Sequence, residues 1–317
     1  MTPLVSILIP AYNAGAWITP TLESALAQTH PRVEIIVIDD GSTDNTRRLA
    51  EDFRLRGVRV VAQPNRGAAA ARNTALGLAT GDYIQFLDAD DLLDPGKISN
   101  QLALLAAASP GKVASCAWAR FSTSPREEVF RPEPTWRDLS GFDFLELHYQ
   151  GGWMMPPIAW LCPRALLTAV GPWREDLSLN DDGEYFCRVL LRSTGIIFCP
   201  RALAYYRSGV AGSLSQQNNA AALASLDRSI QATTRALIAH ENAPRGRLAA
   251  ANAWRRLAHD LYPTLPSEAA HAEQQALALG GSHLRVEGGR LVRATERIFG
   301  WRAAARLKRY RGSHPPR

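Results

Sequence analysis

Residues 83–91 read YIQFLDADD, an apolar and aromatic run that leads directly into three carboxylates. The apolar part has the length and composition of a buried β-strand. Asp88, Asp90 and Asp91 would repel one another when ionised unless a cation lies among them, and hard divalent cations prefer oxygen ligands. We therefore interpret the end of this strand as a metal and phosphate site. The alternative is a solvated turn whose last aspartate caps a helix that begins near Lys97.

The chain before this stretch alternates strand and helix signals. The expected elements are strands at residues 5–9, 33–38, 58–62 and 83–87 and helices at residues 17–28, 45–54 and 68–79. Such a series of β-α repeats predicts an α/β fold with a doubly wound, mostly parallel sheet.

The loops that follow the strands carry the polar residues. Ligands bind outside the carboxyl ends of the strands in open α/β sheets, so residues 10–13, 39–40 and 88–90 should share one crevice. Arg72 should lie near this crevice, where its guanidinium suits a diphosphate, although a surface position on an amphipathic helix is the alternative. The first strand is followed by no Gly-x-Gly-x-x-Gly, and the chain has no Gly-Lys-Ser/Thr. These absences argue against a dinucleotide dehydrogenase and a P-loop enzyme.

A second acidic cluster, DDGEYFCR, occupies residues 181–188 at an expected helix start. The helix dipole could explain Asp181 or Asp182 alone, but capping does not require this pair together with Glu184. A carboxylate held at a helix start could act as the general base for a reacting hydroxyl.

Two further segments have the character of ligand-binding loops. Residues 151–160 are aromatic, rich in Met and broken by Gly and Pro, which suits either the wall of an acceptor pocket or core packing of Trp153 and Trp160. Residues 205–213 form a polar, glycine-rich segment that could close over a ligand.

Charge and cysteine content exclude several classes of protein. The chain carries +6, but residues 284–317 hold nine Arg, one Lys and two Glu, so the excess of positive charge belongs to this tail. A basic tail alone is weak support for nucleic-acid binding, and we expect none. The four cysteines lack metal-binding spacing, so we expect reduced thiols and no structural zinc. We also expect no signal peptide and no transmembrane helix, and hence a cytoplasmic protein.

Residues 218–317 are rich in Ala, Leu, Arg and His in helical runs broken at Pro244, Pro263 and Gly288-Gly289, which predicts a helical appendage. Its last helix spaces apolar residues by three and four and flanks them with arginines. This pattern suits a helix on the inner face of an anionic membrane, and the alternative is a helix packed on the catalytic domain with its arginines in water. The apolar positions are Leu291, Ala294, Ile298, Trp301 and Ala305.

Five stretches together resemble the family 2 glycosyltransferases, inverting enzymes with the nucleotide-diphospho-sugar transferase fold of the A type (GT-A). The stretches stand in the family's order, and the resemblance as a whole covers residues 4–213. The matching stretches are VSILIPAYNAG at 5–15, EIIVIDDGSTDNT at 34–46, NRGAAAARN at 65–73, FLDADD at 86–91 and DDGEYFCR at 181–188.

The resemblance implies a role for each matching residue. Pro10, Tyr12 and Asn13 would line the nucleoside pocket, and Asp39 would receive the base. Arg72 would approach the diphosphate, while Asp88, Ala89 and Asp90 would form the loop that contacts ribose through Asp88 and holds Mn or Mg through Asp90. Asp182 would be the catalytic base.

Two departures from the family pattern stand out. The usual Glu-Asp pair reads Asp181-Asp182, and Ser208-Gly209 follows Arg207 where many relatives have a His near the diphosphate. The first change is chemically mild, whereas the second removes one phosphate or metal contact.

We expect an enzyme that transfers a sugar from a nucleoside diphosphate to a saccharide or lipid-linked acceptor, with inversion of the anomeric centre. The nucleotide we expect is UDP. Residues 1–110 would bind the donor, residues 111–215 the acceptor, and residues 216–317 would form the helical region. The alternatives are a nucleotide-sugar-binding subunit without catalysis and a sugar-1-phosphate nucleotidyltransferase. The chain lacks the Gly-rich basic loop that such a nucleotidyltransferase carries directly after the first strand.

Overall fold

The computed structural model describes residues 2–124, 129–154, 156–209 and 219–312. The chain forms two compact units, one of residues 1–144 and 153–216 and the other of residues 145–152 and 217–317. The functional division that we expect at residues 110 and 215 stays a prediction.

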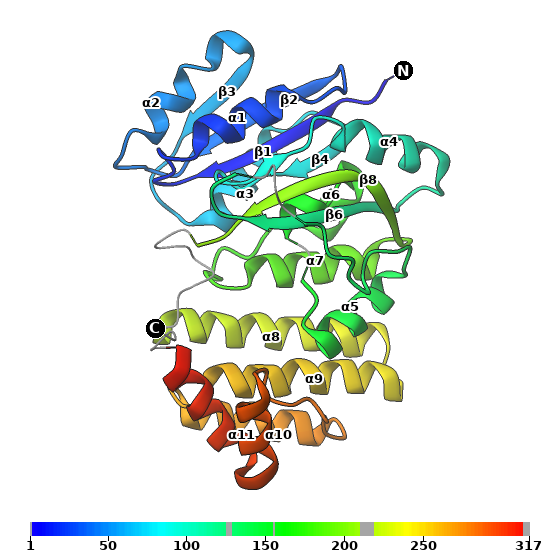
Figure 1. The fold of residues 1–317 in the computed structure, drawn as a ribbon. Coiled ribbons are helices and arrows are strands. Elements are labelled where there is room, and N and C mark those ends of the chain that lie inside the picture. Colours follow the sequence, from blue (N-terminus) through cyan, green and yellow to red (C-terminus); the bar gives the residue numbers. More distant parts are fainter. Residues whose placement is uncertain (1, 125–128, 155, 210–218, 313–317) are drawn as a thin grey trace. The chain divides into compact units, whose positions relative to one another are not determined.

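The main sheet of the first unit has the strand order β3-β2-β1-β4-β7 within the described residues (Figure 1). β1 to β4 run parallel, whereas β7 pairs antiparallel with β4. The strands are β1 (Val5–Ala11), β2 (Val33–Asp39), β3 (Val58–Ala62), β4 (Tyr83–Phe86) and β7 (Cys162–Pro163). All seven residues of β1 are buried, as expected for a strand covered on both faces.

Helices connect the parallel strands in the predicted order. They are α1 (Ile18–Leu26), α2 (Thr46–Glu51) and α3 (Ala68–Leu78), with a short 3-10 helix η1 (Arg54–Arg56) before β3. Right-handed crossovers put α1 and α2 on one face of the sheet and α3 on the other. The doubly wound α/β fold is therefore confirmed.

A smaller sheet, in the order β5-β8-β6, completes the first unit. Its strands are β5 (Leu92–Leu93), β6 (Val113–Phe121) and β8 (Ile196–Arg207). β6 and β8 run parallel, with a register shift between Cys116 and Ala117. The remaining elements up to β8 are α4 (Lys97–Ala107), α5 (Gly141–Gly151), η3 (Pro157–Ala159), α6 (Arg164–Val170) and α7 (Asp181–Arg192).

The second unit is helical, as predicted. Its helices are α8 (Ala220–His240), α9 (Pro244–Leu261), α10 (Pro266–Ala278) and α11 (Arg290–Gly312). The predicted breaks hold: Pro244 begins α9, Pro263 lies between α9 and α10, and Gly288-Gly289 precede α11. A further break, missed from the sequence, lies at Gly300, whose φ of 81° interrupts α11. No helix in the described part of the chain is long and apolar enough to cross a membrane.

Lys97, the first residue of α4, has a fully buried side chain. Its Nζ donates hydrogen bonds to the side-chain carbonyls of Gln85 at 2.5 Å and Gln101 at 2.8 Å. The two amide groups in turn donate to the backbone carbonyls of Ile158 and Ala159. Burial lowers the pKa of Lys97 to about 8, because neutral amides do not replace the hydration of an ammonium group.

We predict that Lys97→Met changes the pH dependence of stability. An unfolded lysine keeps its proton up to about pH 10.4, whereas Lys97 in the fold loses it near pH 8, so the unfolded state binds more protons between these values. The wild type should therefore gain about 3 kcal/mol relative to the variant across this window. Urea unfolding of both proteins at a series of pH values measures it, and a constant difference would contradict the prediction.

Candidate functional site

The ends of β1, β2 and β4 bring three loops to one edge of the main sheet. Ala11 pairs with Asp39 at the ends of β1 and β2, and Leu8 of β1 pairs with Phe86 at the end of β4. The polar residues that follow these three strands therefore start from neighbouring positions.

Asp39 and Asp40 are adjacent and buried, but they are used differently. Asp40 accepts hydrogen bonds from the amide of Gln63 at 2.7 Å and from the backbone N–H groups of Arg66 at 3.0 Å and Gly67 at 2.8 Å. It thereby fixes the loop that leads into α3. Asp39 is 2% exposed, and its Oδ1 has no hydrogen-bond partner among the described residues. A buried acceptor without a donor is costly, so Asp39 Oδ1 is suited to accept a hydrogen bond from a ligand.

Pro10, Tyr12 and Asn13 lie at the end of β1 and in the loop that follows. Pro10 is buried, whereas Tyr12 is 51% exposed. Asn13 adopts a φ of 48°, a left-handed conformation that asparagine tolerates. Its Oδ1 accepts from the backbone N–H of Thr43 at 2.8 Å, and its own N–H donates to Ser42 Oγ at 3.0 Å. Asn13 thus ties the first loop to the second and leaves the Tyr12 ring accessible.

Arg72 is a buried cation between two acids. Its guanidinium donates to Asp88 Oδ1 at 2.8 Å and to Asp181 Oδ2 at 2.7 Å, and it lies 4.6 Å from the centre of the Trp173 ring. Burial opposes the charge, but Asp88 and Asp181 together hold the pKa of Arg72 above its ordinary value. The charged guanidinium therefore links the loop after β4 to the start of α7.

The acids after β4 lie where negative charge is disfavoured. Burial, and then the charge of Asp88, raise the pKa of Asp90 to about 6. Burial and these two neighbours also raise the pKa of Asp91. Arg207 offsets part of the charge, since its backbone N–H donates to Asp91 Oδ1 at 2.7 Å and its Nε to the carbonyl of Asp90 at 2.8 Å. An added cation would be stabilised among these carboxylates.

The donor set fits a metal shared with a substrate. No three His, Cys, Asp or Glu side chains in the described ranges are arranged to hold a metal by themselves. Mg²⁺ binds through one or two carboxylates together with substrate phosphates. Asp90 could take this part, since Asp88 Oδ1 already accepts a hydrogen bond from Arg72. Ala89 lies between them, and its carbonyl already accepts a hydrogen bond from Thr21 Oγ1 at 3.0 Å.

Asp182 occupies the first turn of α7. Asn180 precedes the helix with a φ of 59°, and the N–H of Gly183 donates to Asp182 Oδ1 at 2.8 Å. Burial, and then the charge of Asp181, raise the pKa of Asp182 to about 6 against the opposite effect of Arg72. Such a carboxylate is ionised at neutral pH and basic enough to accept a proton.

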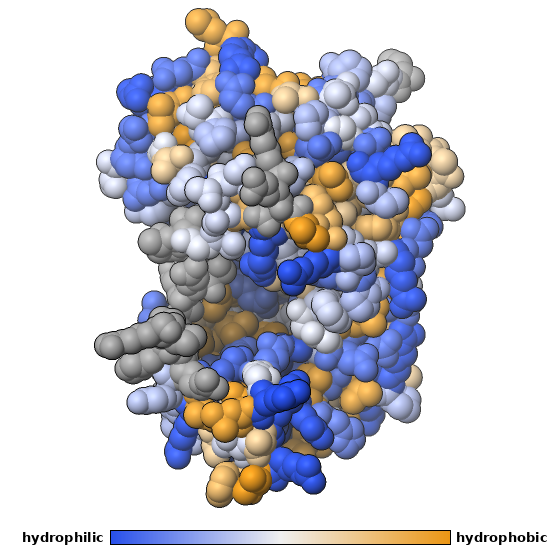
Figure 2. Space-filling view, in the orientation of Figure 1, coloured by the Kyte–Doolittle hydropathy of each residue, from blue (hydrophilic) through white to orange (hydrophobic). Residues whose placement is uncertain are grey.

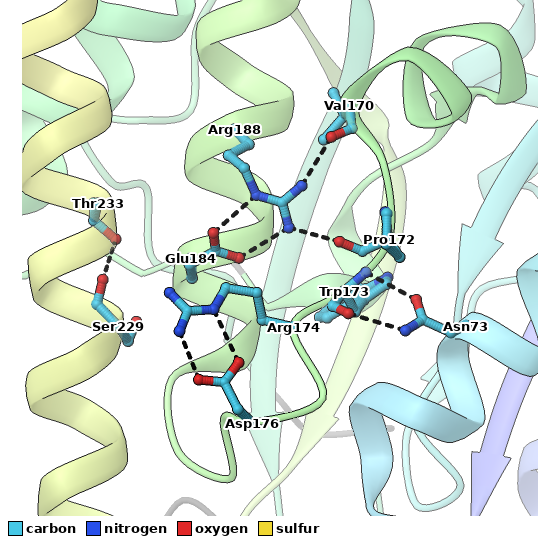
Figure 3. Close-up of polar contacts among 10 residues, drawn as sticks. All are labelled: Asn73, Val170, Pro172, Trp173, Arg174, Asp176, Glu184, Arg188, Ser229 and Thr233. Carbon is cyan, nitrogen blue, oxygen red and sulfur yellow. Dashed lines mark hydrogen bonds and ion pairs between the residues drawn. The ribbon is translucent and has the colours of Figure 1, made fainter.

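Glu184, the third acid of this cluster, is already paired. Its carboxylate forms two hydrogen bonds with Arg188, at 2.8 and 2.9 Å, and Arg188 also donates to the carbonyls of Val170 and Pro172 (Figure 3). Glu184 therefore holds the segment before α7 in place, and it is less available than Asp182 for proton transfer.

Residues 6–167, just over half of the chain, match the family model described as Glycosyl transferase family 2. The chain belongs to this family. It is 43% identical over 106 residues to the putative teichuronic acid biosynthesis glycosyltransferase TuaG of Bacillus subtilis, covering 32% of this chain and 42% of TuaG. It is 48% identical over 102 residues to the Escherichia coli UDP-Glc:alpha-D-GlcNAc-diphosphoundecaprenol beta-1,3-glucosyltransferase WfaP, covering 31% and 40% of the two chains. The match thus spans less than half of either relative.

Solved structures extend the likeness to nearly the whole fold of this family 2 chain. Staphylococcus aureus TarS 1–349 in complex with UDP-GlcNAc matches with a TM-score of 0.73 at 16% identity, over 99% of this chain and 93% of that one. The mannosyltransferase PcManGT of Pyrobaculum calidifontis, in complex with GDP-Man and Mn2+, matches with a TM-score of 0.54 at 23% identity, over 98% and 88%. The predicted GT-A fold is thereby confirmed.

Trp173 belongs to the site of this family 2 chain although the sequence pattern did not single it out. Its ring stacks on Tyr185 with centres 4.0 Å apart. Asn73 fixes its backbone, accepting from the Trp173 N–H at 2.8 Å and donating to the Trp173 carbonyl at 2.9 Å (Figure 3). Since Asn73 and Trp173 are 100 residues apart and lie in no shared motif, local pattern could not pair them.

Arg207 is a second neighbour that the sequence did not mark as part of the acidic loop. Its guanidinium lies 4.2 Å from the ring centre of Trp17 and 4.3 Å from that of Phe121. It also donates to the carbonyl of Ser122 at 2.8 Å. The segment expected to close over a ligand continues to residue 213, and its residues 210–213 lie outside the described part of the chain.

The proposed acceptor segment, residues 151–160, divides into two parts. Trp160 is buried and stacks against Phe186 with ring centres 5.5 Å apart, so it is a core residue. Trp153 and Met154 are half-buried, and a pocket-wall role for them stays a prediction, while Met155 lies outside the described residues.

We predict that Arg72→Lys destabilises the protein by about 2 kcal/mol, because an ammonium group cannot bridge two carboxylates and stack on an indole at once. Arg66→Lys is the matched control, since Arg66 pairs with Glu175 on the surface at 2.6 Å and such pairs contribute less than about 1 kcal/mol. Urea unfolding of both variants decides. Equal losses would contradict the central role of Arg72.

Proposed function

We propose that the protein is an inverting glycosyltransferase that moves a sugar from a nucleoside diphosphate, UDP in the first place, to a hydroxyl of a saccharide or lipid-linked acceptor in polysaccharide or glycoconjugate synthesis. One observation carries the proposal. Arg72 joins the acidic loop after β4 to the start of α7, so a donor-side carboxylate and the candidate base Asp182 belong to one charged cluster. A transferase needs its leaving group and its base held together in this way.

The nucleoside would bind at the ends of β1 and β2. The unpaired Oδ1 of Asp39 is the acceptor that a base N–H would use, and the exposed Tyr12 ring offers a surface for stacking. Pro10 and Asn13 would shape the same pocket, and Asp88 would contact the ribose. The UDP-GlcNAc complex of TarS and the GDP-Man complex of PcManGT, two structural neighbours, support a nucleotide-sugar donor.

Asp90 would hold a divalent cation, Mn or Mg, beside the diphosphate, and Arg72 would lie near the same phosphates. When bound, such a cation neutralises the charge that develops on the departing diphosphate. The Mn2+ in the PcManGT complex supports this assignment.

Asp182 would carry out the proton transfer. Its carboxylate would accept the proton of the acceptor hydroxyl while that oxygen forms a bond to the anomeric carbon and the bond to the diphosphate breaks on the opposite face. One step of this kind inverts the anomeric configuration. Its pKa of about 6 leaves it ionised at neutral pH, and the start of α7 fixes its position.

The competing function is a nucleotide-sugar-binding subunit without catalysis, which would need Asp39 and Asp90 but no base. The raised pKa of Asp182 beside the donor loop favours the enzyme. We further propose that the protein acts in the cytoplasm, where the basic α11 could bring it to the inner face of the membrane.

We predict that Asp90→Ala abolishes the Mn-dependent part of UDP binding, because the carboxylate that would hold the cation is lost. Isothermal calorimetry of UDP with and without Mn measures this effect. Asp52→Ala, which removes an exposed carboxylate on the same unit, is the control and should bind like the wild type. Unchanged Mn-dependent binding by Asp90→Ala would exclude Asp90 as a ligand.

We predict that Asp182→Asn lowers turnover by about 100-fold or more and leaves UDP binding nearly intact, because an amide keeps the shape but cannot accept a proton. Sugar transfer and UDP calorimetry are measured on the same preparation, with Asp176→Asn, at an exposed ion pair with Arg174, as the control. Wild-type turnover by the variant would move the base elsewhere, and equal loss of UDP binding would make Asp182 structural. Absence of sugar transfer by the wild type itself would favour the binding subunit.

A further inference from the structure

The apolar positions of α11 separate into two groups at Gly300. After this residue Trp301, Ala304 and Ala305 are buried, and Trp301 Nε1 donates to Glu273 Oε1 at 2.7 Å. This half of the helix packs within the helical unit, whereas the packing alternative named the catalytic domain. Before Gly300 Val292 is buried, but the larger apolar side chains of Leu291, Ile298 and Phe299 face solvent.

Three large apolar residues in the first half of α11 are exposed: Leu291 by 54%, Ile298 by 70% and Phe299 by 72%. Their spacing of seven and eight places them on one side of a helix. Large apolar side chains gathered at one exposed position commonly mark an interaction surface. In Figure 2 apolar and strongly hydrophilic residues lie side by side over the region that α11 occupies in Figure 1.

Three arginines lie beside this apolar group. Arg285, Arg293 and Arg297, with Ala294 and Ile298, line an open groove of about 540 Å³. Within the described ranges none of these three arginines forms an ion pair or a side-chain hydrogen bond.

The acids nearest to these arginines along the chain are already engaged. Glu287 pairs with Arg256, and Glu296 accepts from the backbone N–H of Val286 at 3.2 Å. In contrast, Arg302, beyond Gly300, pairs with Glu273 at 2.6 Å. Among the described residues no carboxylate pairs directly with the three arginines of the groove, whereas Arg302 in the packed half has an acidic partner.

We propose that residues 285–299 form a docking surface for an anionic lipid bilayer. Lipid phosphates would occupy the groove between Arg285, Arg293 and Arg297, while Leu291, Ile298 and Phe299 enter the boundary between headgroups and acyl chains. Charge complementarity favours an anionic bilayer over the other occupants of this surface. A second copy of the chain would bring like charges together, and an apolar protein surface would bury the guanidinium groups without partners. The biological role of this docking surface rests on the proposed function, because a lipid-linked acceptor lies in such a bilayer.

Cosedimentation of the full chain with vesicles tests the proposal. Binding should require phosphatidylglycerol, be absent with phosphatidylcholine alone, and weaken with salt. The triple variant Arg285→Gln, Arg293→Gln and Arg297→Gln should bind about 100-fold more weakly, because each basic residue near an anionic surface strengthens binding several-fold. The control Arg235→Gln, Arg245→Gln and Arg247→Gln removes the same charge from exposed positions of the same unit and should bind like the wild type.

A second pair of variants tests the apolar contribution. Leu291→Ser, Ile298→Ser and Phe299→Ser together should also weaken binding, whereas Leu248→Ser and Leu277→Ser, exposed on α9 and α10, should not. Equal binding by the groove variant and its charge control would overturn the proposal. The proposal would also be overturned if light scattering showed that the groove variant loses a dimer formed by the wild type while its vesicle binding is unchanged. UDP calorimetry on every variant separates this result from the proposed function, because UDP binding should stay unchanged throughout.

Discussion

The buried guanidinium of Arg72 is the contact on which the rest of the site depends. It lies between Asp88 and Asp181, which come from segments more than ninety residues apart, and it stacks on Trp173. Two carboxylates in a poorly solvated place would repel each other without it. Because the guanidinium is planar and carries several donors, it can serve both acids at once. The position of α7 relative to the main sheet is therefore set by charge as well as by apolar packing.

The remaining acids of the site are left with less compensation, and this gives them their chemistry. The pKa values of Asp90 and Asp182 are both raised to about 6, first by burial and then by a neighbouring aspartate. Asp90 follows β4, where a cation and a diphosphate would meet, whereas Asp182 begins a helix. The same physical cause thus favours a metal ligand at one position and a proton acceptor at the other.

The second unit has an exposed part and a packed part along one helix. Gly300 interrupts α11, and the buried Trp301 follows it, so the exposed residues before the break are released from the packing requirement. Arg302, on the packed side, pairs with Glu273, whereas Arg293 and Arg297, beside the exposed apolar residues, form no ion pair among the described residues.

The sequence by itself determined the parallel strands β1 to β4 and their connecting helices, since β-branched runs and helical periods alternate locally, and it located the acidic loops, which follow directly from strand ends. It also placed the breaks at Pro244 and Gly288-Gly289. The antiparallel β7 and the short β5 came only from the structure. The family resemblance named Asp39, but only the tertiary structure shows how it differs physically from Asp40. Donors from Gln63, Arg66 and Gly67 occupy Asp40, while Asp39 Oδ1 has no hydrogen-bond partner among the described residues. The tertiary structure likewise decided that Trp173 supports Arg72 and that Leu291 and Trp301 face different surroundings. Such contacts join residues distant in the chain, or depend on what covers an apolar helix face. Periodicity identifies neither the distant partner nor the covering surface.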